Sequence, residues 1–143
     1  MKNISIVYAT MTKHSRKLAT AIGQALSVKA ENVKDSPVLQ DVDLLFIVGG
    51  LYGGESLQEL KSFVSGLDGR AVKSVALVTS CASKKHGQTG IRALLEEKGV
   101  TVVDEFLCQG NFLWMGFGHP NQADLEEAVR FARRLAGKEK DPA

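Results

Sequence analysis

Three hydroxyl side chains near the start of the chain have the types and spacing of an anion-binding turn. They belong to Thr10, Thr12 and Ser15, within residues 8–15. This segment follows an apolar run and precedes residues with helical periodicity, so it links a predicted strand to a predicted helix. At such a junction the hydroxyl groups and the free N–H groups of the first helical turn suit a phosphate group. Helix capping by the same hydroxyl groups is the alternative interpretation.

The same segment lacks the patterns of two common phosphate-binding loops. It contains neither Gly-x-Gly-x-x-Gly nor Gly-Lys-Ser/Thr. The first pattern is typical of dinucleotide-binding dehydrogenases and the second of nucleoside triphosphatases. Both classes of enzyme are therefore disfavoured.

Two further polar segments follow predicted strands. Residues 48–55 contain four glycines and one aromatic side chain, Tyr52, and residues 79–83 read Thr-Ser-Cys-Ala-Ser. In open parallel sheets, ligands bind beyond the carboxyl ends of the strands, near the point where the strand order reverses. The segments that follow residues 8, 48, 79 and 107 are therefore the candidate ligand-binding segments.

The elements that position these segments follow from the hydrophobic pattern. Apolar runs of strand length lie at 4–8, 44–48, 75–78 and 100–106, with a weaker run at 27–33. Helical spacing covers 18–26, 57–67, 91–95 and 125–135. Strands that alternate with helices predict parallel β-α-β crossovers and an α/β fold, a three-layer αβα sandwich. The strands are apolar throughout because both faces of such a sheet are covered.

The length and composition indicate one domain. The chain has 143 residues, of which 44% are hydrophobic, and this suits one core rather than two. We expect a single domain over residues 1–137 and a frayed tail over 138–143. The longest apolar run has about five residues, against roughly 20 for a membrane-spanning helix, and the N-terminus lacks a secretory signal pattern. These features predict a cytoplasmic protein that does not bind membranes.

The cysteine and histidine residues form no familiar metal-binding pattern. Cys81 and Cys108 each follow a predicted strand, without a Cys-x-x-Cys motif. We interpret them as small packing residues, with a redox pair as the alternative. His14, His86 and His119 are isolated from one another in the sequence. The sequence therefore predicts no metal site.

The formal net charge is +2, but the charges are distributed unevenly. No acidic residue precedes Glu31, and none lies between Asp68 and Glu96, whereas both stretches contain several lysines and arginines. These basic stretches are either solvated helix faces or a basic rim around the segments near residues 10 and 80. The pI of about 8.6 lies below the ~9 that is typical of nucleic-acid-binding domains, so we expect no nucleic acid partner.

Residues 8–15 resemble the phosphate loop of flavodoxins, whose pattern is Ser/Thr-x-Thr-Gly-Asn-Thr. Thr10, Thr12 and Ser15 match the hydroxyl positions, whereas Lys13 and His14 replace the usual glycine and asparagine. The resemblance covers essentially the whole chain, and its length is similar to that of the short-chain members of the family. It implies a flavodoxin-like fold with a five-stranded parallel sheet in the strand order 2-1-3-4-5.

The resemblance also implies FMN as the cofactor, bound by three segments. Tyr52 stands where flavodoxins place an aromatic side chain against the flavin ring, and residues 80–82 stand where the family passes main-chain groups along its pyrimidine edge. The implied cofactor-binding residues are Thr10, Met11, Thr12, Lys13, His14 and Ser15, then Gly50, Leu51, Tyr52, Gly53 and Gly54, and finally Ser80, Cys81 and Ala82.

Two departures from the family pattern bear on function. Residues 80–90 contain no aromatic side chain, so one face of the flavin is either open or covered by the aromatic segment 109–119. That segment is otherwise a hydrophobic plug over the end of the sheet. The chain also lacks the strong negative charge of flavodoxins. Basic groups around the flavin would favour its reduced anion, so we expect a less negative reduction potential than is usual for the family.

The resemblance implies an electron-transfer protein that carries electrons between a reductase and an acceptor enzyme. No nucleophile–base pair indicates hydrolytic or transferase chemistry, so no catalytic residue is predicted. One alternative is an FMN-dependent reductase that acts on a small organic acceptor. Others are a flavodoxin-like activator of ribonucleotide reductase and a scaffold without flavin, because Lys13 replaces the family's glycine. A phospho-receiver domain is disfavoured, since Ala9-Thr10 and Gly49-Gly50 stand where it needs acidic residues.

Overall fold

The computed structural model describes residues 3–9, 14–52, 55–80, 88–107 and 122–137. The strands are β1 (Ile4–Tyr8), β2 (Ala30–Asn32), β3 (Val42–Tyr52), β4 (Glu55–Ser56), β5 (Val72–Ser80) and β6 (Thr101–Leu107). The helices are α1 (His14–Leu26), α2 (Gln58–Ser65), α3 (Thr89–Glu97) and α4 (Gln122–Ala136), with a short 3-10 turn, η1 (Val33–Asp35). None of the described helices has the length and apolar character that a membrane crossing requires.

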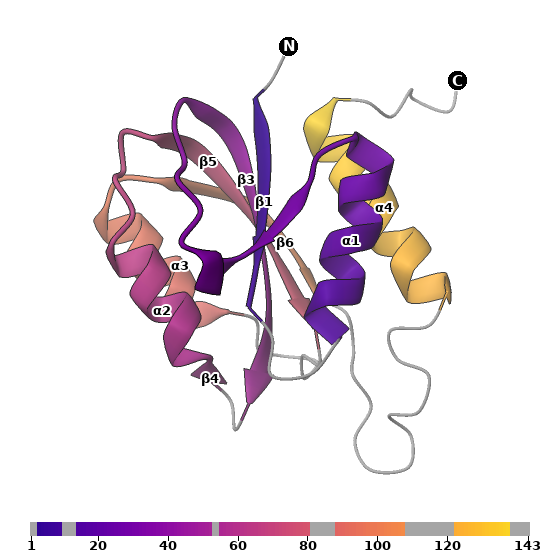
Figure 1. The fold of residues 1–143 in the computed structure, drawn as a ribbon, viewed down its shortest axis with the longest axis horizontal. Coiled ribbons are helices and arrows are strands. Elements are labelled where there is room, and N and C mark those ends of the chain that lie inside the picture. Colours follow the sequence, from indigo (N-terminus) through magenta and orange to yellow (C-terminus); the bar gives the residue numbers. More distant parts are fainter. Residues whose placement is uncertain (1–2, 10–13, 53–54, 81–87, 108–121, 138–143) are drawn as a thin grey trace.

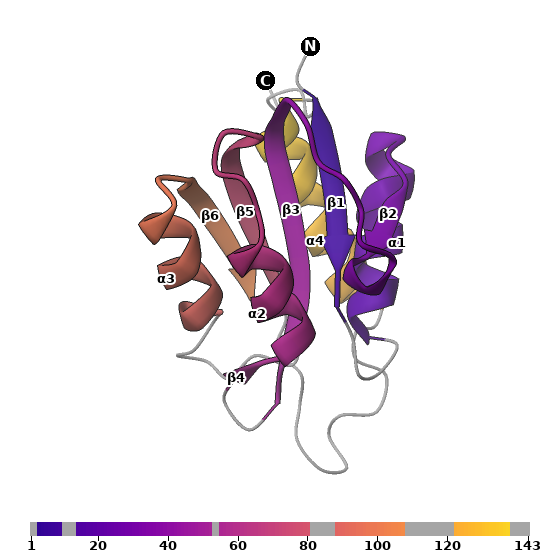
Figure 2. The same cartoon turned by 60° about the vertical axis from the view of Figure 1, so that its left-hand side comes forward.

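Five parallel strands form the sheet in the order β2-β1-β3-β5-β6. Figure 1 shows this sheet between two layers of helices, and Figure 2 shows its strands side by side. Counted without the two-residue β4, which pairs antiparallel with the end of β3, this is the predicted order 2-1-3-4-5. The predicted three-layer α/β fold is therefore confirmed.

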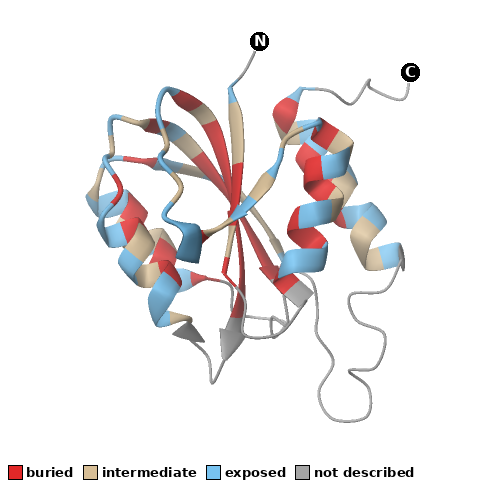
Figure 3. Ribbon diagram, in the orientation of Figure 1, coloured by how far each residue is buried: buried red, intermediate tan, exposed pale blue. Residues whose placement is uncertain are grey.

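Helices cover both faces of the sheet, and the strand side chains alternate between two cores. Phe46 packs on the α1 and α4 side, whereas its neighbours Leu45 and Ile47 pack on the α2 and α3 side. All three are fully buried, and Figure 3 shows buried positions gathered in the central part of the sheet. The uninterrupted apolar runs in the sequence thus have the cause that was expected, which is burial on both faces.

A β-bulge in β6 changes which residues face which core. Val75 of β5 pairs with Val102, but the next residue of β5 pairs with Asp104, so Val103 is the extra residue and is 47% exposed. Asp104 consequently faces α4, where its carboxylate lies 3.1 Å from the Arg134 guanidinium. Glu105 faces α3 instead. Simple strand alternation from Val102 would have placed these two carboxylates on the opposite faces.

The amino end of the sheet is held by a carboxylate. The backbone N–H of Asn3 donates a 2.8 Å hydrogen bond to Asp43, and the Lys73 ammonium lies 3.3 Å from the same carboxylate. The Asn3 N–H, followed by Lys73, lowers the pKa of Asp43 from its ordinary value. This group therefore stabilises the fold in its ionised form.

Replacement of Val75 by alanine should lower the free energy of unfolding by about 2 kcal/mol, because it removes two methyl groups from a fully buried site. The matched control is Val38→Ala, since Val38 is 91% exposed and its loss should cost less than about 0.5 kcal/mol. Urea unfolding measures both values. Equal losses in the two variants would contradict the assigned core.

The lowered pKa of Asp43 predicts a pH dependence of stability. Its contribution is present above the ordinary pKa of an aspartate and is lost as the pH falls through the lowered pKa of the folded state. The wild type should therefore be more stable than Asp43→Asn at neutral pH, and the difference should shrink in strong acid. Urea unfolding of both proteins across the acidic range is the measurement. A difference that stays constant would contradict the assignment.

Candidate functional site

The carboxyl ends of β1, β3 and β5 meet at one edge of the sheet. Tyr8 pairs with Val48, which also pairs with Val78, and Gly50 pairs with Ser80. The Ala9 N–H continues the first ladder with a 3.0 Å hydrogen bond to the Val48 carbonyl. From β1 the chain passes to β2 on one side, and β3 lies on the other side. The strand order therefore reverses between β1 and β3, which is where open α/β sheets bind ligands.

Helix α1 begins at this edge, and its start differs from those of α2 and α4. Its first residue is His14, and its first turn contains no acidic side chain. By contrast, α2 carries Glu59 and α4 carries Asp124 in their first turns. The partial positive charge at the start of α1 is therefore available to an anion.

Ser15 lies in the first turn of α1 and is fully buried. The sequence predicted that its hydroxyl group is one of three that hold a phosphate. The structure places Ser15 at this edge, buried in the first turn of the helix. The other two hydroxyl residues, Thr10 and Thr12, lie outside the described residues, as do Met11 and Lys13.

The second predicted segment is largely strand rather than loop. Strand β3 continues four residues past Val48 to Tyr52, and β4 then pairs with it, with Tyr52 opposite Glu55. Gly50 is held by pairing with Ser80 of β5, whereas Leu51 and Tyr52 are held in a short hairpin with β4 beyond that point (Figure 1). Gly53 and Gly54, which connect the two strands, lie outside the described residues.

The third predicted segment begins where β5 ends. Ser80 is the last residue of β5 and pairs with Gly50, so the second and third segments leave the sheet side by side. Cys81 and Ala82 lie outside the described residues. The structure therefore brings the described parts of all three predicted segments to one edge.

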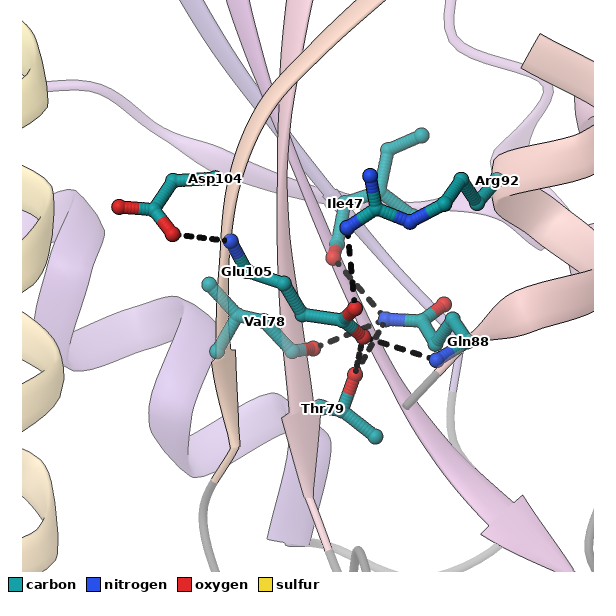
Figure 4. A network of polar contacts seen from close by, with 7 residues as sticks. All are labelled: Ile47, Val78, Thr79, Gln88, Arg92, Asp104 and Glu105. Atoms are coloured by element: carbon teal, nitrogen blue, oxygen red, sulfur yellow. Dashed lines mark hydrogen bonds and ion pairs between the residues drawn. The ribbon is translucent and has the colours of Figure 1, made fainter. Parts of the chain in front are cut away.

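A partly buried polar network beneath this edge was not predicted from the sequence. Figure 4 shows that its centre is the Glu105 carboxylate. One oxygen of Glu105 accepts hydrogen bonds from the Thr79 hydroxyl at 2.9 Å and from the Gln88 backbone N–H at 2.8 Å. Its other oxygen lies 3.3 Å from the Arg92 guanidinium. Because these residues are far apart in the sequence and match no motif, no local signal could have revealed the network.

The side chain of Gln88 ties two strands together. It is fully buried, and its Nε2 donates to the Val78 carbonyl and the Thr79 hydroxyl, both at 3.1 Å, and more weakly to the Ile47 carbonyl at 3.4 Å. The Oε1 has no hydrogen-bond partner among the described residues. A buried amide with an unpaired oxygen costs free energy, so its position needs another reason.

Gly49 makes room for this amide. A Cβ atom at position 49 would lie 2.8 Å from Leu60 Cδ2 and 3.2 Å from Gln88 Oε1. The family resemblance implies Gly50, Gly53 and Gly54 as cofactor-binding residues but does not include Gly49. The structure shows that Gly49 is required by the packing of the protein itself.

The described residues contain no group of three or more His, Cys, Asp or Glu side chains that could hold a metal ion. Within that part of the chain, the edge offers helix N-termini, backbone groups and polar side chains, with the charged pair of Glu105 and Arg92 beneath it.

The sequence matches no protein-family model and no curated protein, but the fold is shared with solved structures. A flavodoxin from the domain Archaea has a TM-score of 0.72 and 20% identity, over 96% of this chain and 98% of that chain. Oxidised flavodoxin 2 from Bacillus cereus has a TM-score of 0.65 and 20% identity, over 96% and 99%. An azoreductase from Bacillus anthracis has a TM-score of 0.65 and 12% identity, over 97% and 100%.

These likenesses show that the chain has the flavodoxin-like fold. The resemblance that the sequence predicted is confirmed at this level, over nearly the whole chain.

Replacement of Gly49 by alanine should destabilise the protein by about 1–3 kcal/mol, because the added methyl group overpacks the site and would lie 2.8 Å from Leu60. Gly90→Ala is the matched control, since its Cβ would meet only Lys61 Cε at 3.9 Å. Gly90 lies in α3, where alanine is the better helix former by about 1 kcal/mol. Urea unfolding should therefore show a lower free energy of unfolding for Gly49→Ala and a higher one for Gly90→Ala. An unchanged free energy of unfolding in Gly49→Ala would contradict the packing.

Proposed function

We propose that this chain is an FMN-binding electron-transfer protein that carries electrons between a reductase and an acceptor enzyme. The observation that carries the proposal is the start of α1. It lies at the point where the strand order reverses, and its first turn has no carboxylate to compensate its positive end. An anionic group such as the FMN phosphate suits this position.

The phosphate is proposed to bind between β1 and α1. The backbone N–H groups at the start of α1 are the donors that remain available when a helix begins. The segment between Ala9 and His14 contains Thr10, Thr12 and Lys13, which would add two hydroxyl donors and one positive charge. This assignment of residues is supported by the family resemblance.

The flavin ring is proposed to lie against the β3–β4 hairpin and the end of β5. The hairpin carries Tyr52 beyond the sheet edge, and Ser80 leaves the sheet beside Gly50. A ring held there would stack on an aromatic side chain and present its pyrimidine edge to the backbone of residues 80–82. The paired strands at the base of both segments would limit their movement.

When bound, FMN supplies the redox chemistry through its isoalloxazine ring. The residues of this chain then have three tasks, which are to hold the phosphate, to orient the ring and to set its potential. Basic residues in the acid-free stretches, namely Lys13, His14, Lys84, Lys85 and His86, are proposed to raise the potential above the range of acidic flavodoxins. The same charges would favour acidic redox partners, and the proposed place of action is the cytoplasm.

A second candidate function is an FMN-dependent reductase that acts on a small organic acceptor. It is supported by the likeness of this fold to an azoreductase over the whole of that chain. Steady-state oxidation of NADH or NADPH by the isolated protein with a quinone acceptor distinguishes the two functions. A carrier requires a separate reductase for turnover, whereas a reductase does not.

The first test of the proposal is the binding of FMN to the purified protein. We expect micromolar affinity, and we expect Tyr52→Ala to weaken binding about tenfold, since a stacked ring contributes on the order of 1 kcal/mol beyond its buried area. Tyr52→Phe retains the ring and should bind nearly as well as the wild type. Quenching of FMN fluorescence measures all three affinities. Failure of the wild type to bind would exclude both the carrier and the reductase.

A further inference from the structure

The Glu105 network joins the two chain ends between which residues 81–87 run. Thr79 precedes the end of β5, and Gln88 is the residue before the first helical residue of α3. Both donate to the same oxygen of Glu105, and Gln88 Nε2 also donates to the Thr79 hydroxyl. Residues 79 and 88 are therefore linked twice, once directly and once through the carboxylate (Figure 4).

The carboxylate also supplies the charge that α3 lacks. The first turn of α3 contains no acidic side chain, and its N-cap, Gln88, makes no side-chain capping hydrogen bond. Glu105 instead reaches the helix start from β6 and accepts the Gln88 N–H. A negative charge at this position is favourable because it faces the positive end of the helix dipole.

The bulge in β6 is what aims Glu105 at α3. Val103 is the extra residue, and without it Asp104 rather than Glu105 would share the face of Val102. Bulges commonly occur next to functional sites, where they redirect a side chain. This one lies in the strand beside β5, below the edge proposed to bind the cofactor.

The network is poorly explained by stability alone. Partly exposed charge pairs such as Glu105–Arg92 contribute little net stability, and Gln88 Oε1 has no hydrogen-bond partner among the described residues. Hydrogen bonds that join several elements can instead impose one arrangement on the groups they join. Here the joined groups are the carboxyl end of β5 and the start of α3.

We infer that Glu105 is a positioning residue of the cofactor site. It holds the end of β5 and the start of α3 in the one arrangement that presents the backbone of residues 80–82 to the pyrimidine edge of the flavin. This inference rests on the proposed function. Glu105 acts through Thr79 and Gln88, without contact with the cofactor. Its influence should reach the ring of the flavin and leave the phosphate at the start of α1 unaffected.

The main test compares Glu105→Gln with the wild type in affinity for FMN and for riboflavin, which lacks the phosphate. The amide oxygen can still accept from Thr79 and Gln88, which share one carboxylate oxygen in the wild type, but the amide NH2 group cannot accept from Arg92 and the negative charge is lost. We expect both affinities to fall by the same factor, about tenfold, because hydrogen bonds to a charged group are lost. A loss confined to FMN, or no loss in a folded variant, would overturn the inference.

Two controls separate positioning from general destabilisation. Asp104→Asn alters a carboxylate on the same strand that pairs with Arg134 on the opposite face, and Val75→Ala weakens the core without touching the network. Both should bind the two flavins like the wild type. If Val75→Ala weakens flavin binding as much as Glu105→Gln does, the role of Glu105 is merely structural and the inference fails.

A measurement on the flavin-free protein keeps the inference distinct from the proposed function. The Gln88 amide proton is bound to the Glu105 carboxylate at an N···O distance of 2.8 Å, so its NMR shift and hydrogen exchange report on the network directly. In Glu105→Gln we expect a shifted resonance and exchange about tenfold faster than in the wild type. An unchanged Gln88 amide would overturn the inference even if the wild type binds FMN.

If Glu105→Gln fails to fold, Thr79→Val is the second variant. It removes one donor to Glu105 while it retains the carboxylate, Gln88 and the shape of the side chain. We expect a smaller but equal weakening of FMN and riboflavin binding. Wild-type affinities in a folded Thr79→Val, with an unchanged Gln88 resonance, would count against the inference.

Discussion

The central constraint on this molecule is that its parallel sheet is covered by helices on both faces. Every side chain in the middle of β3 is then buried, whichever face it points to, as Leu45, Phe46 and Ile47 show. In β3, polar side chains occur only near the two ends, at Asp43 and Tyr52, where water or hydrogen-bond partners can satisfy them. The same constraint therefore produces the core and confines the chemistry to the carboxyl edge.

At that edge, the starts of three helices differ in how their positive ends are satisfied. Helix α2 carries its own carboxylate, Glu59. The start of α3 is instead contacted by the carboxylate of Glu105, which lies on the neighbouring strand β6. Helix α1 has none in its first turn. This difference makes the start of α1 the position best suited to the proposed anionic ligand, and it is consistent with the positioning role proposed for Glu105 on the α3 side. The proposed site thus has two parts. The start of α1 binds the anionic phosphate, and the Glu105 network fixes the backbone at the end of β5 and the start of α3.

The sequence predicted the fold well because hydrophobic periodicity is a local property that survives folding. It predicted the extent of β3 poorly, since Gly49 and Gly50 are typical of loops. In the structure both glycines pair with β5, opposite Thr79 and Ser80. Pairing with a neighbouring strand overrode the weak local preference of these residues. The candidate site was predicted as far as its segments, because the family pattern is carried by contiguous residues.

By itself, then, the sequence determined the alternation of strands and helices, the segments at the strand ends and the basic character around two of them, all of which are local patterns. Only the tertiary structure decided that Glu105 rather than Asp104 faces α3, because one extra residue in β6 shifts the register with β5. Only the fold could bring Thr79, Gln88 and Glu105 within hydrogen-bond distance of one another. Such contacts depend on strand pairing over long sequence separations, which no local pattern encodes.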